Sequence, residues 1–539
     1  MKKNSKFYFV SFFMVLVWNL ILFFIPLFFW ADQCVFLEIE LFSLNSVMFS
    51  FIFYFDWISL IFMSIVLIIS SMIMIYSKGY MGKECHRFLW MTFLFIVFML
   101  IMILSPSILG VILGWDGLGL ISFCLVIYYQ SLSSYNSGFI TAASNRVGDT
   151  LIILSIVWAS SSGGFMFWEN PNGMMFFMLA CFTKSAQFPF SAWLPAAMAA
   201  PTPISSLVHS STLVTAGVYM MIRFYECLLE SFLTQLMLII SLITILVAGL
   251  SALQEFDMKR LVAFSTLGQL GFMTMILSLG YIYVAFFHLL IHALFKALLF
   301  MCTGSIIHSS GGIQDLRKMG SLMLNPLTSV SLNISLFSLM GVPFSSGFYS
   351  KDSLLELSLC SYGGTGLGIL MSLMALITIA YSVRVIYYFS SLLGWVVWSA
   401  GASNVIVPIS CLGFINIISG SILNWVILEL NLICLGYLKY TPLLMVVLGF
   451  MWHGKVCLSI KSTWIYSSLL YVNSLTSGLG MMIKLFFVGM KLLDQGWAEG
   501  ALTFNKLLTL KSSEMLKSSS EKHLTIFSSG VALIMMLLI

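Results

Sequence analysis

Apolar segments long enough to cross a lipid bilayer follow one another along almost the whole 539-residue chain, separated by short polar loops. A spanning helix needs roughly 20 apolar residues, and about 15 segments approach that length. A backbone surrounded by lipid must satisfy its own hydrogen bonds, so the pattern predicts an all-α polytopic membrane protein. We expect spans at 7–29, 49–75, 88–105, 107–129, 139–160, 173–198, 202–222, 232–253, 260–280, 282–308, 322–360, 364–390, 405–427, 440–453 and 524–539.

Lysines precede the first apolar run, at 7–29, in the manner of a signal peptide. The run is longer than the apolar region of a typical signal peptide, and no small-x-small cleavage site follows it. We therefore expect a retained first helix. The positive-inside rule places its N-terminus on the cytoplasm-like side, because basic residues gather in the loops of that side. They are Lys2, Lys3, Lys6, Lys78, Lys83, Arg87, Lys259, Arg260, Arg317 and Lys318.

The composition leaves no room for a soluble domain of useful size. Hydrophobic residues make up 60% of the chain and charged residues 8%, too few to solvate the surface of a soluble protein of this length. The net charge of +5 is spread out, without the basic run that binds nucleic acid. The ten cysteines form no C-x-x-C motif and no Cys/His cluster, which disfavours metal, iron–sulfur and disulfide-framework classes.

Two spans carry helix-breaking residues beside a lysine. Lys184 is followed by Pro189, and Lys351 follows Gly341 and Pro343. Proline removes a helix hydrogen bond and glycine permits unusual backbone angles. Paired interrupted helices are typical of inverted-repeat transporters, in which the ion site lies at the breaks. An ordinary proline kink is the alternative, and the lysine beside each break argues against it.

The segment 483–523 differs from the rest because charged residues recur in it at near-helical spacing between Leu, Phe and Met. A helix of ~40 residues reaches about 60 Å, twice the hydrocarbon core of about 30 Å. The segment also carries too many charges to span the bilayer. We expect an amphipathic helix in the membrane plane, with 524–539 re-entering the bilayer as a short last helix.

Several ionisable residues lie inside apolar stretches, among them Asp116, Lys184, Lys296 and Lys351. A charge at mid-bilayer costs about 3 kcal/mol on insertion scales, so such residues face one another or a water-filled path. The default interpretation is an ion or proton route. Asp116 has no basic neighbour in sequence, and Lys184 is its natural partner from another helix. Moving that carboxylate would change whether the lysine holds its proton.

Histidines extend the set of candidate proton carriers. His288, His292 and Lys296 recur at i, i+4 and i+8, so they line one helix face. His209 lies in a separate apolar span. Histidine titrates near neutral pH and can relay protons. A lone membrane histidine is more often a packing residue, and a His pair at i and i+4 can bind zinc, but no further ligand lies nearby in sequence.

Two pairs of oppositely charged residues lie close together in the sequence, and each pair has two possible interpretations. Arg146 and Asp149 are three residues apart and can pair on one helix face. They form either a structural ion pair near the interface or a functional partner for the lysine region. Lys351 and Asp352 form either a salt bridge at a helix end or an access site beside the broken helix.

Seven motifs occur here in the order in which one family carries them, and together they are specific. They are Gly114-Trp-Asp-Gly117, Asn145-Arg-Val-Gly-Asp149, Lys184-Ser-Ala-Gln-Phe-Pro189, Ala200-Pro-Thr-Pro-Ile-Ser-Ser-Leu-Val-His209, Asp257-Met-Lys-Arg-Leu-Val-Ala-Phe-Ser-Thr266, His292-Ala-Leu-Phe-Lys296 and Gly347-Phe-Tyr-Ser-Lys-Asp352. Over about residues 45–390 the chain closely resembles the subunit-five family of the proton-pumping NADH–ubiquinone oxidoreductase, respiratory complex I.

The resemblance implies an antiporter-like fold of two inverted five-helix repeats with broken helices and a lateral amphipathic helix. It implies that Asp116 and Lys184 form the charged pair at the first break, with Asp149 as a second acid. His209, His288, His292 and Lys296 would be the central relay, and Lys351 with Asp352 the exit. The expected division is 1–106 N-terminal helices, 107–222 first repeat, 232–390 second repeat, 391–462 C-terminal helices, 463–523 lateral helix region and 524–539 terminal helix.

The resemblance also implies the setting. NADH, flavin, iron–sulfur clusters and ubiquinone would be held by other subunits, with no cofactor and no metal on this chain. The expected partners are the adjacent antiporter-like subunit and other membrane-arm subunits, with phospholipids including cardiolipin and no nucleic acid. The location would be the mitochondrial inner membrane, N-terminus toward the matrix. The alternative is a cation/proton antiporter subunit of the Mrp type; a purely structural scaffold leaves the buried charges unexplained.

Two departures from the family pattern matter. The family usually has glutamate where this chain has Asp116, and the shorter side chain loses one methylene of reach toward Lys184. We also expect the N-terminus to lack one helix of longer relatives, which would explain an N-terminus on the matrix side.

Overall fold

The chain forms two compact units, Met1–Leu470 and Tyr471–Ile539, in a computed structural model. The structure describes residues 5–30, 33–44, 47–82, 85–162, 165–166, 173–228, 231–320, 326–360, 364–390, 403–427 and 440–452 of the first unit. It describes residues 478, 484, 487–491, 500 and 505–511 of the second. The predicted lateral helix region 463–523 therefore lies largely outside the described residues, and the terminal helix 524–539 lies wholly outside them.

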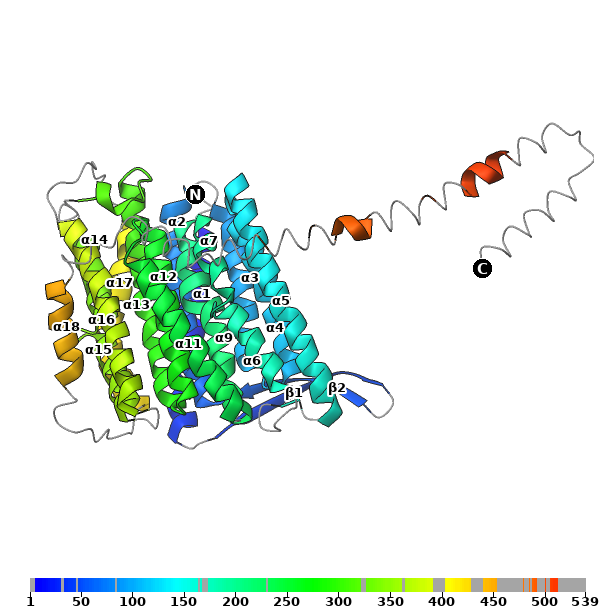
Figure 1. Ribbon diagram of the computed structural model, residues 1–539, viewed down its shortest axis with the longest axis horizontal. Coiled ribbons are helices and arrows are strands. Elements are labelled where there is room, and N and C mark those ends of the chain that lie inside the picture. Colours follow the sequence, from blue (N-terminus) through cyan, green and yellow to red (C-terminus); the bar gives the residue numbers. More distant parts are fainter. Residues whose placement is uncertain are drawn as a thin grey trace, which may run out of the picture. The chain divides into compact units, whose positions relative to one another are not determined.

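The first unit is a bundle of helices that run side by side (Figure 1). Nine helices within the described residues are long and apolar enough to cross a membrane. This confirms the predicted polytopic helical class. The long helices are α2 Trp57–Met81, α3 Cys85–Leu104, α4 Ile108–Val126, α5 Leu132–Ser162, α11 Ser231–Ala252, α12 Met258–Ser278, α13 Ile282–Ser309, α16 Gly364–Ser390 and α17 Ser403–Ile427. Further helices include α1 Ser5–Trp30 and α18 Thr441–Trp452.

Helix α13 is the core of the bundle. It contacts α2, α8 (Thr202–Leu207), α12, α14 (Pro326–Met340), α15 (Ser346–Cys360) and α17, and its membrane-crossing window is wholly buried inside the protein. Helix α5, by contrast, exposes large apolar residues such as Ile153, Val157 and Trp158 along its length. His288, His292 and Lys296 of α13 are therefore inside the protein, whereas Arg146 of α5 is more than half exposed.

A two-stranded antiparallel hairpin precedes α2, where the sequence pattern predicts none. Strand β1 (Val35–Leu44) pairs with β2 (Val47–Phe55), and Val35 lies opposite Phe55. The predicted span 49–75 therefore begins too early. Its first residues are β-branched and aromatic, which suits a strand as well as a helix. A two-stranded sheet leaves edges unpaired, so it belongs at the membrane surface and not in the hydrocarbon.

Both predicted helix breaks are present. At the first, α6 (Met174–Lys184) is followed by the short helices α7 (Trp193–Ala196) and α8 (Thr202–Leu207), a π-helix (Val208–Thr212) and α9 (Leu213–Arg223). At the second, α14 (Pro326–Met340) is separated from α15 (Ser346–Cys360). Gly341 turns the chain there with φ +80°, a conformation that favours glycine.

Candidate functional site

Lys184 is the last residue of α6 and is buried against α4. Its Nζ donates a hydrogen bond to the Trp115 carbonyl at 3.3 Å and lies 4.9 Å from the centre of the Trp115 ring. A Cβ at Gly119 would come within 3.3 Å of the same nitrogen. The small residue on α4 therefore makes room for the ammonium group, and the tryptophan face stabilises it through a cation–π contact.

The two acidic residues near Lys184 differ in their positions. Asp116 is 41% exposed at its side chain, and its carboxylate lies 3.9 Å from Arg146, so its ion pair is with the arginine. Arg146 also donates to Asp149 Oδ2 at 3.1 Å, which confirms the predicted helix-face pair. The Asp149 side chain is only 12% exposed. Of the two acids, Asp149 is the more buried.

The two carboxyl groups themselves are neighbours. Both face the same nitrogen of Arg146, Nη1, at 3.9 Å for Asp116 and 3.1 Å for Asp149. Asp149 Oδ1 is buried and has no hydrogen-bond partner in the described part of the chain. The first break thus gathers two acids, one arginine and one lysine.

His209 lies in the π-helix beyond the break and is buried. Its ring is 6.0 Å from the ring of Trp193, whose Nε1 donates to the Thr183 carbonyl at 3.0 Å. Trp193 thereby ties the end of α6, next to Lys184, to the histidine side of the break. Neither ring nitrogen of His209 has a hydrogen-bond partner among the described residues.

His288, His292 and Lys296 are fully buried along one face of α13, as their spacing predicts. The two imidazole rings are 6.5 Å apart. His288 is hydrogen-bonded to Ser350 Oγ at 2.9 Å and to Gln269 Oε1 at 3.1 Å. Lys296 donates to Ser265 Oγ at 2.5 Å.

Lys351 lies on α15, directly after the second break, and is buried. Its ammonium group donates to the Leu339 carbonyl, at the end of α14, and to Thr378 Oγ1 on α16 at 3.1 Å. The neighbouring residue Ser350 is the one that binds His288. The row on α13 therefore reaches the second break through the His288–Ser350 contact, and Asp352 follows half-buried on the same helix.

Comparison with known proteins identifies the family. Residues 105–378 match the family model described as NADH:quinone oxidoreductase/Mrp antiporter, and residues 41–89 match the one described as the N-terminus of complex I chain 5. A protein of Aedes aegypti named NADH-ubiquinone oxidoreductase chain 5 is 44% identical over 92% of both chains, and one of Locusta migratoria is 46% identical over 76% of this chain and 75% of its own. The chain belongs to the NADH-ubiquinone oxidoreductase chain 5 family.

Solved structures share the antiporter-like fold. The Mrp complex of Dietzia superposes with a TM-score of 0.76 at 22% identity, over 93% of this chain and 60% of that one. An archaeal membrane-bound sulfane sulfur reductase superposes with a TM-score of 0.65 at 20% identity, over 83% of this chain and 94% of the other. Membership of the chain 5 family and this fold agree with the architecture expected from the sequence.

Sequence reasoning passed over several residues that the fold brings to the site. Four polar residues form hydrogen bonds with the proposed proton carriers: Ser265 with Lys296, Gln269 and Ser350 with His288, and Thr378 with Lys351. Each is a common polar residue in an apolar helix, so the sequence alone does not single it out. Glu356 is buried on α15, one turn beyond Asp352, and its charge inside an apolar run was a usable signal.

The expectation of no metal and no cofactor stays a prediction for this family member. Within the described ranges, no three His, Cys, Asp or Glu residues lie together as metal ligands would. The described cysteines are free thiols.

Proposed function

We propose that this chain is a proton-translocating core membrane subunit of an NADH:ubiquinone oxidoreductase, and that the buried residues described above carry the proton. Membership of the chain 5 family supports the assembly. The observation that carries the proton route is the line of buried ionisable groups between the two helix breaks. Such groups are costly in a membrane unless they serve a path.

Each group has a distinct part in the proposed route. Protons enter at the matrix side and load Lys184, whose ammonium form Asp149 and Asp116 stabilise. His209 and the α13 row of His292, His288 and Lys296 pass the charge toward the second break. Lys351 and Asp352 release the proton on the opposite side. Imidazole nitrogens without a partner can accept a proton on one side and donate on the other.

The setting of this route is part of the proposal. The subunit lies in the mitochondrial inner membrane with its N-terminus toward the matrix, and the segment 463–523 forms a lateral helix that contacts the adjacent antiporter-like subunit. Phospholipids, including cardiolipin, cover its apolar surface. Other subunits bind NADH, FMN, iron–sulfur clusters and ubiquinone, and the energy of their redox chemistry reaches this chain as a shift of charge.

A second candidate is a cation/proton antiporter subunit, favoured by the close superposition on the Mrp complex. Purification of the native assembly separates the two. Co-migration of the chain with NADH-oxidising, quinone-reducing activity supports the first function, and a chain that purifies without that activity supports the antiporter.

The direct test is Lys184→Met in the native assembly, reconstituted in vesicles. We expect assembly to survive and the number of protons moved per electron to fall, because methionine is an unbranched side chain only one atom shorter than lysine and carries no charge. Lys318→Met, at an exposed lysine, is the matched control and leaves the ratio unchanged. A normal proton-to-electron ratio in Lys184→Met overturns the proposed function.

A further inference from the structure

A stripe of buried polar side chains runs along α9, away from His209. Ser211, Thr215, Tyr219 and Arg223 are spaced by four residues, so they share one helix face. Thr215 Oγ1 donates to the Ser211 carbonyl at 2.8 Å, and Arg223 Nε donates to Tyr219 Oη at 2.8 Å. The stripe begins in the π-helix that holds His209 and ends at the last residue of α9, at one edge of the bundle.

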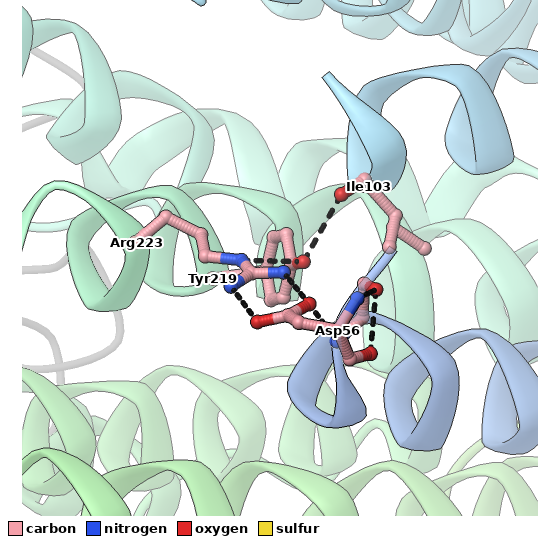
Figure 2. Close-up of polar contacts among 5 residues, drawn as sticks. Asp56, Ile103, Tyr219 and Arg223 are labelled. Carbon is pink, nitrogen blue, oxygen red and sulfur yellow. Dashed lines mark hydrogen bonds and ion pairs between the residues drawn. The ribbon is translucent and has the colours of Figure 1, made fainter. Parts of the chain in front are cut away.

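The stripe ends in an ion pair with Asp56, the residue before α2. Two guanidinium nitrogens of Arg223 bind the two carboxylate oxygens at 2.6 and 2.5 Å (Figure 2). Tyr219 Oη donates to the Ile103 carbonyl at the end of α3, at 3.1 Å. The ring of Tyr54, in β2, lies 5.6 Å from the guanidinium carbon. The pair thus joins α2, α3, α9 and the hairpin at the end of the bundle where α9 ends and α2 begins.

Asp56 is held in place and held charged. Its carboxylate accepts from the Ser59 backbone N–H at 3.0 Å, and Ser59 Oγ receives the Asp56 N–H at 3.1 Å, the reciprocal cap of α2. Burial alone would raise the pKa of Asp56, but the hydrogen bonds and charge of Arg223 outweigh it and hold that pKa below its usual value. The pair therefore stays ionised throughout the physiological pH range.

A gain in folding stability does not by itself explain why the Asp56–Arg223 ion pair is buried. Both side chains are about one-tenth exposed, at 9% and 11%, whereas the arginines of the other ion pairs among the described residues are more than half exposed. A buried ion pair is weak evidence of stabilisation, because desolvation offsets most of the attraction. A guanidinium at a pore constriction, by contrast, is an effective barrier to protons and cations.

We propose that the Asp56–Arg223 pair is a plug that closes the α9 stripe against proton leak. This inference rests on the proposed proton route, since only a protein with a proton at His209 needs that direction closed. A polar stripe from the relay to the surface beside β2 would otherwise release protons before they reach Lys351. The partner groups of the plug are Tyr54, Tyr219 and the end of α3, which exclude water from around the guanidinium.

The test measures passive proton leak across vesicles that contain the whole assembly, without NADH and under an imposed potassium diffusion potential. The doubly neutral variant Asp56→Asn with Arg223→Gln keeps the hydrogen-bonding groups and removes both charges. We expect its leak to rise roughly tenfold, which corresponds to a barrier lower by about 1.4 kcal/mol. Arg223→Lys keeps the charge and stays tight. Arg317→Gln with Asp315→Asn, an exposed ion pair, is the matched control and also stays tight.

A second change shows whether the leak runs along the stripe. Adding Tyr219→Phe to the doubly neutral variant removes the hydroxyl next to the plug, and we expect the leak to fall back toward that of the unaltered protein. A structural role alone predicts no such rescue. If the doubly neutral variant fails to assemble, Arg223→Gln alone carries the same test, because Asp56 keeps its cap.

The outcome separates this inference from the proposed function. A doubly neutral variant that is as tight as the unaltered assembly overturns the plug, while coupled pumping lost in Lys184→Met would leave the proposed function standing. A leak that Tyr219→Phe does not reduce also overturns it. Normal pumping in Lys184→Met overturns the proposed function itself, whatever the leak.

Discussion

The two helix breaks share the same glycine–carbonyl contact between their half-helices, but the polar groups around their lysines differ. In each, a glycine on the second half-helix packs against a carbonyl of the first: Gly217 faces Cys181 O, and Gly347 faces Ser338 O. Lys184 then has acidic neighbours, whereas Lys351 is held by a carbonyl and a hydroxyl. A nearby carboxylate stabilises an ammonium charge, and neutral oxygens do so less. In the proposed route this difference makes Lys184 the lysine that holds its proton more firmly and Lys351 the one that releases it.

Lys296, between the breaks, resembles Lys351 more than Lys184. Its hydrogen bond goes to Ser265, and its neighbours on α13 are two histidines. The hydrogen bonds of Lys296 and Lys351 therefore go to neutral oxygens, whereas the first break holds two carboxylates. In the proposed route, a proton that moves from Lys184 to Lys296 leaves these carboxylates, which requires energy from outside the chain.

The largest effect is expected from a substitution that disrupts the glycine–carbonyl contact between the two half-helices of a break. A Cβ at Gly347 would lie 1.8 Å from Ser338 O, so Gly347→Ala forces the two half-helices apart. Overpacking of this kind costs about 3 kcal/mol or more. We expect loss of the assembled subunit, measured as its abundance in native gels. Gly217→Ala, with 2.6 Å to Cys181 O, should be milder; an equal abundance for both variants would contradict the packing argument.

The next effect distinguishes the two acids at the first break. Asp149→Asn removes the more buried carboxylate, and we expect pumping to fall roughly tenfold, as a loss of about 1.4 kcal/mol gives. Asp116→Asn removes an exposed partner whose ion pair is worth at most about 1 kcal/mol, so the fall should be smaller. Initial rates of proton movement in vesicles measure both. The reverse order would show that Asp116 is the main partner of Lys184.

A related substitution restores the side-chain length that Asp116 lacks relative to the glutamate usual in the family. Asp116→Glu lengthens the side chain by one methylene toward Lys184. We expect it to recover part of the pumping lost in Asp149→Asn, with the same initial-rate measurement. Two changes that act independently, with no recovery in the double variant, would exclude a shared role of the acids.

The last comparison concerns the neutral hydrogen-bond partners of Lys296 and Lys351. Ser265→Ala takes the hydrogen bond from Lys296, and an interaction with a charged donor is worth about 1.5–3 kcal/mol, so pumping should slow by roughly tenfold or more. Thr378→Val leaves Lys351 its bond to Leu339 O, so we expect only about a fivefold fall. For each of the two variants, the turnover rate of the assembly is measured together with its rate of proton movement. Equal effects would imply that the Leu339 bond does not hold Lys351.

Local patterns predicted much of the fold and part of the site. Apolar length predicted the spans, Pro and Gly predicted both breaks, and helical spacing predicted the Arg146–Asp149 pair and the face of α13. The hairpin at 35–55 was missed because aromatic and β-branched residues suit strand and membrane helix alike. The partners Ser265, Ser350 and Asp56 were missed because their roles depend on contacts between helices far apart in sequence. The domain division and the roles of the site residues stay predictions.

In the proposed function the two helix breaks belong to one proton route through Lys296. The measurement that tests it is the proton-to-electron ratio of the reconstituted assembly for Lys184→Met, Lys296→Met and the double variant. One route predicts that all three lose the same number of protons per electron, because groups that act in series are not additive. A double variant that loses the sum of the two single losses would contradict a single route and show two independent paths.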